Sequence, residues 1–339
     1  MSGSDVGREG VRGARPGREA PTGAHAGRRR RRRGRGERQM VPDVRFSSYY
    51  GKPVLNKPTW KALDIAGYLY LGGLAGASSL LAAGGHATGR PDLARVAKLG
   101  AAGAITVSLG ALVHDLGRPA RFVNMLRVFK PTSPMNLGSW LLAGYAPLTM
   151  AAAAADVAGR FRLLGAAATG AAAALGPAVA TYTAVLLSDT AVPSWHEGYR
   201  ELPFVFAGSA ASTAAGLALV CAPATQTGPA RRTAVLGAAL ETGAFTLMKR
   251  RMGLAAEPFE QGAAHRLLRA AELLTAGGAA LAACAGPRRG RGLAVAAGAA
   301  LLTGSAALRF GVFRAGVASA EDPKYTVVPQ RERLRARAG

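Results

Sequence analysis

The ionisable residues whose spacing most suggests chemistry form a cluster at the end of an apolar stretch. They are His114, Asp115, Arg118 and Arg121, within the sequence HDLGRPAR. A carboxylate at the C-terminal end of a helix is disfavoured by the helix dipole, so Asp115 requires a partner, most simply Arg118 or Arg121. Two interpretations remain open. The ion pair anchors the helix end at a membrane interface, or Asp115 and its neighbours exchange protons at the rim of a lipid-accessible pocket.

Candidate hydrogen-bonding groups lie at comparable depth in two other apolar stretches. Tyr182 stands between Thr181 and Thr183, and Asp64 precedes Tyr68 by one helical turn. A tyrosine at this depth can donate a hydrogen bond to a ligand carbonyl or to neighbouring backbone, and the sequence leaves both alternatives open. Tyr68, Tyr182 and Asp64 are therefore candidate binding residues.

Two charges lie deeper in apolar stretches. Glu241 and Arg309 are each surrounded in sequence by mainly apolar residues. An unpaired charge inside a membrane is expensive, so we expect these two residues to form a buried ion pair. The favoured interpretation is a structural role rather than a step in a proton path.

The sequence provides no ligands for a metal redox centre. Cys221 and Cys284 lie far apart with no CxxC spacing, which excludes a disulfide scaffold, a Cys-ligated zinc site and an iron–sulfur cluster. A bis-histidine haem needs two imidazoles at matched depth on facing helices. The histidines outside the N-terminal segment offer no such pair: His86, His114, His196 and His265. We therefore expect no haem and no metal site.

The elements that must position these residues are long apolar stretches rich in Gly and Ala. Each has roughly the length needed to cross a hydrocarbon core as a helix. The stretches are residues 62–84, 95–114, 139–158, 164–188, 203–223, 232–248, 267–285 and 293–313. The sequence predicts an all-α integral membrane protein with eight transmembrane helices in two four-helix-bundle-like halves. The alternative, an Ala-rich soluble bundle, would show a polar face on every helix.

Eight spans place both termini on one side of the membrane. The longer loops, residues 115–138, 189–202 and 249–266, lie on that side, which we call the motif face. Lys and Arg are only slightly more frequent there than on the far face, so the positive-inside rule leaves the orientation open. We expect a multi-pass protein of the plasma membrane.

The net charge of +24 is not evenly distributed. Residues 1–39 contain twelve Arg and four acidic residues, and a segment of this composition is expected to be disordered. Residues 40–61 are a pre-membrane segment, 62–313 the membrane domain and 314–339 a C-terminal tail. Because the rest of the chain is mainly apolar, nucleic-acid binding is not expected.

Several segments resemble the NrfD/PsrC family of quinone-linked membrane subunits. The most specific is DLGRPARFVNMLRVFKPTSPMNLGSW at residues 115–140. The others are residues 72–79, 181–195, 201–213 and 309–331. The resemblance implies an eight-helix subunit with no prosthetic group of its own, which binds menaquinone or another quinone. It also implies two partners: an iron–sulfur subunit of the four-cluster ferredoxin type, and through it a molybdopterin catalytic subunit.

Together these observations predict a membrane anchor that exchanges electrons between the iron–sulfur subunit and quinone or quinol. Asp115 and His114 would exchange protons, and Tyr182 and Tyr68 would orient the quinone ring, with Asp64 and Arg118 also lining the site. The expected docking residues are Arg121, Phe122, Pro131 and Trp195. The alternatives are a secondary transporter, which would ordinarily show inverted repeats, and a purely structural anchor without a quinone site.

Overall fold

The computed structural model describes residues 6–7, 10–11, 54–56, 58–115, 124–286 and 290–338. Residues 59–316 form one compact unit, which we call the helical unit, and residues 1–58 with 317–339 form a second. In the second unit, strands β1 (Val6–Gly7) and β2 (Gly10–Val11) pair antiparallel, and α12 (Lys324–Ala338) is a helix. Most of residues 1–39 lies outside the described residues, so a disordered segment there stays a prediction.

Eight long helices begin in the described part of the helical unit. Each coincides, to within a few residues at most ends, with one of the eight expected apolar stretches. They are α2 (Ala62–Ala87), α3 (Pro91–Asp115), α5 (Pro134–Ala158), α6 (Arg162–Ser188), α8 (Leu202–Cys221), α9 (Gly228–Met252), α10 (Gly262–Cys284) and α11 (Arg291–Glu321). The short elements at the motif face include α7 (Pro193–His196) and the 3-10 helix η2 (Gly253–Glu260).

Among the described residues, seven helices are long and apolar enough to cross a membrane. The exception is α9, in which Arg231 and Arg232 lie near the start, Glu241 near the middle, and Lys249 to Arg251 at the end. All-helical membrane architecture is therefore confirmed, whereas the eighth span is not established by length and composition alone.

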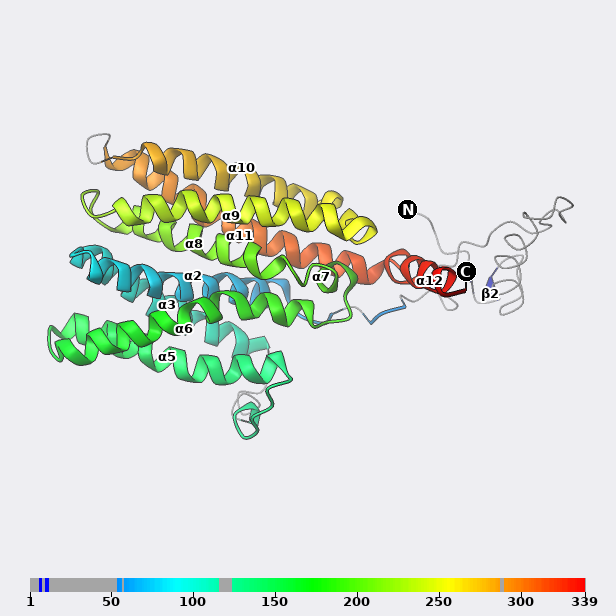
Figure 1. The fold of residues 1–339 in the computed structure, drawn as a ribbon, viewed down its shortest axis with the longest axis horizontal. Coiled ribbons are helices and arrows are strands. Elements are labelled where there is room, and N and C mark those ends of the chain that lie inside the picture. Colours follow the sequence, from blue (N-terminus) through cyan, green and yellow to red (C-terminus); the bar gives the residue numbers. More distant parts are fainter. Residues whose placement is uncertain are drawn as a thin grey trace, which may run out of the picture. The chain divides into compact units, whose positions relative to one another are not determined.

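The helices of the helical unit form two groups (Figure 1). In the first half, α2 packs against α3 and α6, and α5 packs against α3 and α6. In the second half, α9 packs against α8 and α10, while Gly298 and Gly304 of α11 contact α8 and α10 respectively. Contacts of α8 with α2 and α6 join the halves.

The helix ends follow local sequence signals. The hydroxyl of Ser133 accepts a hydrogen bond from the backbone N–H of Asn136, and Pro134 occupies the first position of α5. Gly159, with φ of 62°, ends the same helix in the left-handed conformation that glycine favours. The expected last span ended at residue 313, but α11 continues to Glu321 because no proline interrupts the sequence from there to Pro323. The C-terminal tail is likewise helical over α12.

Small residues allow the helix backbones to approach closely. A Cβ atom on Gly76 of α2 would lie 2.4 Å from the carbonyl oxygen of Gly176 of α6. Large apolar side chains point outward instead, and Val107, Leu236 and Leu273 are 60%, 70% and 67% exposed. This distribution is typical of helices that pack through Gly and Ala and present apolar side chains to lipid.

Contacts between loops establish the motif face. The hydroxyl of Ser194 donates a hydrogen bond to the carbonyl of Ala255 at 2.9 Å, which joins the loop before α8 to η2. The ring of Trp60, just before α2, stacks on Trp195 with centroids 6.0 Å apart. These segments therefore meet at the same end of the helical unit, as predicted from the number of spans.

A buried charged pair lies toward the far face of the first half. The Nζ atom of Lys98 lies 2.7 Å from Oδ1 of Asp156, and the Lys98 side chain is only 5% exposed. Arg95 lies 3.6 Å from the other carboxylate oxygen of Asp156. The pair joins α3 to the last turn of α5.

Candidate functional site

At the motif face, the start of α2 meets the end of α3 through a polar pair. Asp64 lies in the first turn of α2 and His114 in the last turn of α3, with Oδ2 of Asp64 3.0 Å from Nδ1 of His114. The helix dipoles favour an acidic group at the start of α2 and a cationic group at the end of α3. The Asp64 side chain is 14% exposed and the His114 side chain 66% exposed, so the pair extends from the protein interior to the surface.

Asp115, the last residue of α3, is partly exposed next to His114. Its expected partners Arg118 and Arg121 lie outside the described residues, as does Phe122. Whether Asp115 pairs with an arginine therefore stays a prediction. The contact that the structure does describe is between His114 and Asp64, two candidates that sequence reasoning had not paired.

Two tyrosine rings meet one turn further into the protein. Tyr68 follows Asp64 on α2, and its ring contacts that of Tyr182 on α6 edge to face, with centroids 6.4 Å apart and planes at 78°. The Tyr68 backbone carbonyl accepts a hydrogen bond from the hydroxyl of Ser108 at 3.2 Å, which joins α2 to α3. Helices α2, α3 and α6 thus bring four of the predicted site residues into two adjoining contacts.

The Tyr182 hydroxyl is buried and has no hydrogen-bond partner within the described part of the chain. A buried polar group left unsatisfied costs about 1–3 kcal/mol. Gly138 of α5 leaves room for this ring, because a Cβ atom there would lie 2.5 Å from Cε2 of Tyr182. The packing therefore fixes a hydroxyl donor inside the protein, where a ligand carbonyl oxygen could accept its hydrogen bond.

Trp195 cannot act as an exposed docking residue. Its side chain is fully buried, stacks on Trp60 and donates a hydrogen bond from Nε1 to the carbonyl of Val312 at 2.8 Å. Phe313 packs against the same ring, with centroids 5.6 Å apart. The predicted docking role of Trp195 is therefore wrong: the sequence shows a tryptophan at a membrane interface, but not that α11 and the segment before α2 cover it.

Pro131, in contrast, lies exposed in the loop that precedes α5. Asn136 holds this loop, donating hydrogen bonds from Nδ2 to the carbonyls of Met125 at 2.7 Å and Val128 at 2.8 Å. The neighbouring Val128 and Phe129 side chains are 62% and 63% exposed. The loop is thus fixed from within while its apolar side chains point outward.

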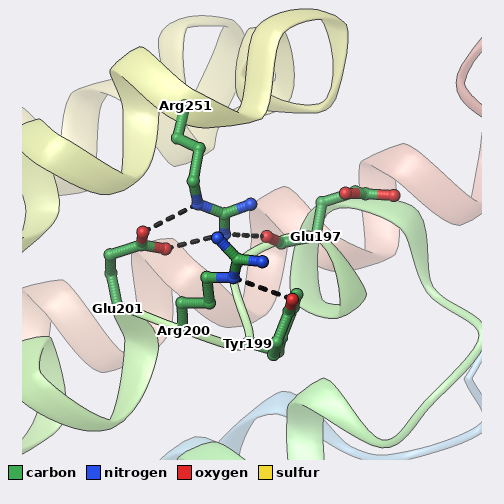
Figure 2. A network of polar contacts seen from close by, with 5 residues as sticks. All are labelled: Glu197, Tyr199, Arg200, Glu201 and Arg251. Atoms are coloured by element: carbon green, nitrogen blue, oxygen red, sulfur yellow. Dashed lines mark hydrogen bonds and ion pairs between the residues drawn. The ribbon is translucent and has the colours of Figure 1, made fainter.

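A second polar cluster fixes the end of α9 to the segment before α8 (Figure 2). Nε and one terminal nitrogen of Arg251 donate hydrogen bonds to the two carboxylate oxygens of Glu201, each at 2.7 Å. The same terminal nitrogen donates to the backbone carbonyl of Glu197. Arg200 donates from Nε to the hydroxyl of Tyr199 at 2.8 Å.

Sequence reasoning missed this cluster because Glu201 and Arg251 are fifty positions apart, one directly before α8 and the other in the last turn of α9. The hydrogen bonds from Arg251 are the main reason why the pKa of Glu201 lies below its ordinary value. The geometry is that of a bidentate ion pair, which joins two elements and places each charge next to one of opposite sign. Its evident role is structural.

Glu241 and Arg309 lie in the second half, and both are buried, with 4% and 1% exposure. Arg309 donates a hydrogen bond to the carbonyl of Phe206 at 3.0 Å, and its guanidinium lies 3.6 Å from the centroid of that ring. The expected direct ion pair is not found among the described contacts, because this interaction with Phe206 turns the guanidinium toward α8. The two charges are still close enough to attract each other.

Metal ligands do not gather anywhere in the described residues: no three His, Cys, Asp or Glu side chains there could hold a metal ion. Cys221 and Cys284 are free thiols, and both residues are exposed.

Comparison with protein families identifies the chain. A family model described as polysulphide reductase, NrfD, matches residues 53–318. The chain belongs to the NrfD family. The match contains every described candidate residue and excludes the N-terminal Arg-rich segment. No curated protein matches the chain in sequence.

Membership of the NrfD family and seven sufficiently apolar helices in the described residues make the chain a multi-pass membrane protein. It is a membrane subunit of the kind found in polysulphide-reductase-like oxidoreductase complexes.

Proposed function

We propose that this NrfD-family chain anchors a molybdopterin and iron–sulfur oxidoreductase in the membrane. There it exchanges electrons between a docked iron–sulfur subunit and membrane quinone or quinol. The observation that carries the proposal is the Tyr182 hydroxyl, which is buried beside Tyr68 and lacks a partner among the described residues. A quinone carbonyl is an acceptor of the type this hydroxyl requires, and menaquinone is the quinone we propose.

Quinone supplies chemistry that couples electron transfer to proton transfer, so the protein must deliver protons beside its hydrogen-bond donor. The Tyr182 hydroxyl orients one carbonyl, while Tyr68 limits the position of the ring. His114 reaches solvent and Asp64 lies behind it, so this pair can hold a proton and exchange it with water. We also assign Asp115, next to His114, and Arg118 to the proposed quinone site.

The electrons must come from outside the chain. Two separate cysteines cannot ligate an iron–sulfur cluster, which requires four protein ligands. The fixed loop before α5, with Val128, Phe129 and Pro131 exposed, is the proposed docking surface for the iron–sulfur subunit. Arg121 and Phe122 precede this loop in the sequence, and we propose that they also contact the iron–sulfur subunit.

We also propose that α9 is the eighth span. Between Arg232 and Lys249 its only ionisable residue is Glu241, over roughly 24 Å of helix. Its outward face is apolar, with Leu236 70% and Leu247 59% exposed. Basic residues at both ends can extend toward the membrane interfaces, so the low average hydropathy does not prevent α9 from crossing the membrane.

The function can be tested by quinone-dependent turnover of the intact complex in native membranes. Tyr182→Phe removes one hydroxyl and should lower this turnover about tenfold, since a lost hydrogen bond of about 1.4 kcal/mol has that effect. Turnover of the catalytic subunit with an artificial electron mediator should not change. Tyr199→Phe, at an exposed tyrosine of the same face, is the matched control.

Wild-type quinone turnover in assembled Tyr182→Phe complexes would contradict the assignment. Quinone in lipid extracts of the purified protein would distinguish a quinone-reactive anchor from a purely structural one. Co-purification with a cysteine-rich subunit would exclude an independent transporter.

A further inference from the structure

The second half contains a groove between α9 and α10 whose volume is about 340 Å³. It is lined on α9 by Glu241, Phe245 and Lys249, which share one helix face at intervals of four residues. On α10 it is lined by His265, Arg269 and Glu272, which share one helix face at intervals of four and three residues. The groove therefore runs parallel to the axes of α9 and α10.

The groove reaches far into the membrane. Glu241 precedes the end of α9 at Met252, and Glu272 follows the start of α10 at Gly262, by about 15 Å of helix in each case. That distance is about half the thickness of the hydrocarbon core. Lys249 and Glu260, 3.4 Å apart, lie at the motif-face end. The groove thus extends from that face to near the middle of the bilayer.

Charged groups are exposed along this groove at a depth where lipid tails would be a poor environment. Arg269 and Glu272 lie 2.7 Å apart, and their side chains are 58% and 51% exposed. Exposed charges at this depth are expensive in hydrocarbon, which favours water in the groove. Its volume is sufficient for several molecules, because water occupies about 30 Å³ in the liquid.

Glu241 forms the deep end of the groove. It is 4% exposed, and its Oε2 atom has no hydrogen-bond partner among the described residues. Arg309 of α11 attracts it, although Nε and Nη1 of that guanidinium also lack partners in the described structure. The other groups near Glu241 are the hydroxyls of Ser209 on α8 and Thr275 on α10. Tyr70 of α2 lies beside Arg309, and Glu272 of α10 lines the groove at the depth of Glu241. A carboxylate with an open acceptor position at the end of a polar groove can take up a proton from water.

We propose that the α9–α10 groove is a water-filled access path through which Glu241 exchanges protons with the solution at the motif face. One proton passes from groove water to a Glu241 carboxylate oxygen, and the reverse step returns it to water. Arg309 stays charged throughout, so the pair changes from neutral to singly positive. This site lies in the half of the protein that does not contain the proposed quinone site.

Water access can be measured by cysteine labelling of the full chain in membrane vesicles of both orientations. The background replaces Cys221 and Cys284 by serine, and the probe is a membrane-impermeant methanethiosulfonate. Thr242→Cys lies in the groove next to Glu241, whereas Leu240→Cys lies at the same depth on the outward apolar face. Because a thiol reacts as its hydrated thiolate, Thr242→Cys should react at least about tenfold faster.

Reaction of Thr242→Cys should occur from the side that also labels Thr132→Cys, an exposed marker of the motif face. Equal, slow labelling of Thr242→Cys and Leu240→Cys would overturn the proposal, and would show that lipid or another subunit's helix fills the groove.

Proton uptake is tested with dicyclohexylcarbodiimide, which modifies protonated carboxyls in membranes. An adduct on Glu241 that is lost in Glu241→Gln supports exchange, and an unlabelled Glu241 overturns it. Neither measurement involves quinone, so failure here leaves the proposed function intact.

Discussion

The carboxylate of Asp64 lies 3.0 Å from the imidazole of His114, and this contact ties the first turn of α2 to the last turn of α3. The two residues are fifty positions apart, yet the antiparallel packing of consecutive helices makes them neighbours. One partner is largely covered and the other faces solvent. The contact thus links the surface of the protein to the turn that carries Tyr68.

If this pair delivers protons, its members act as a unit. Asp64→Asn and His114→Gln should each lower quinone-dependent turnover by about 10²-fold, the usual effect of losing a general acid–base group. The double variant should be no slower than the slower single variant, because the second change removes a function already lost. Turnover of the three variants in the assembled complex checks this, and multiplicative losses would indicate independent roles.

Gly138 determines where the Tyr182 ring can lie. Gly138→Ala places a methyl group 2.5 Å from that ring, so we expect the ring to move and bound quinone to be lost. Overpacking of this kind costs about 1–3 kcal/mol of stability. Quinone content and the thermal unfolding midpoint of the purified complex report the two effects.

Gly170→Ala is the matched control, because a Cβ atom there meets nothing within 4 Å. It should be neutral or slightly stabilising, since alanine favours helix more than glycine does. Equal quinone content in both alanine variants would contradict the steric explanation.

The Glu201–Arg251 pair predicts a specific loss of stability in acid. Hydrogen bonds from Arg251 hold the pKa of Glu201 below its ordinary value of 4.5. The stabilisation is therefore fully present above pH 4.5 and is lost as the pH falls through the lower folded-state pKa. Glu201→Gln should lower stability by about 1–3 kcal/mol at neutral pH and remove part of the acid dependence.

Thermal unfolding of the purified protein between neutral pH and pH 3 measures both effects. Glu272→Gln, in the exposed pair with Arg269, should change stability by less than about 1 kcal/mol. An acid dependence that is the same in wild type and Glu201→Gln would show that other groups cause it.

The pair of Lys98 and Asp156 predicts that the stability lost in a single variant is recovered when both residues are replaced. Lys98→Met leaves Asp156 without its closest partner and should cost about 1–3 kcal/mol, because Asp156 is partly exposed and keeps Arg95 nearby. Lys98→Met combined with Asp156→Leu removes both charges and should recover most of that loss. The yield of folded protein and the unfolding midpoint in detergent test this, and a double variant as unstable as the single one would refute it.

The helices could be predicted from the sequence, because apolar length and breaking residues are local properties. The expected stretch 139–158 ends where α5 ends, before Gly159, but α5 begins five residues earlier, at Pro134. The extension of α11 to Glu321 was missed, because apolarity fades before any residue stops the helix.

The contacts between helices could be predicted only in part, because they depend on how each helix is rotated about its axis. Asp64, Tyr68, His114 and Tyr182 were found as residue types, but their pairing follows from the packing of α2 against α3 and α6. The same limit explains Trp195, which other segments cover, and Arg309, which faces Phe206 rather than pairing directly with Glu241.

The glycine contact between α2 and α6 also has a consequence for assembly. Glycine and alanine lose no side-chain rotamer freedom when two helices come together, whereas long side chains lose up to about 2 kcal/mol each. Gly76 and Gly176 therefore join their helices at almost no entropic cost in side chains, while the larger apolar residues stay free to rotate in lipid. Helices that have already formed can thus associate while the large side chains that face lipid keep most of their rotamer freedom.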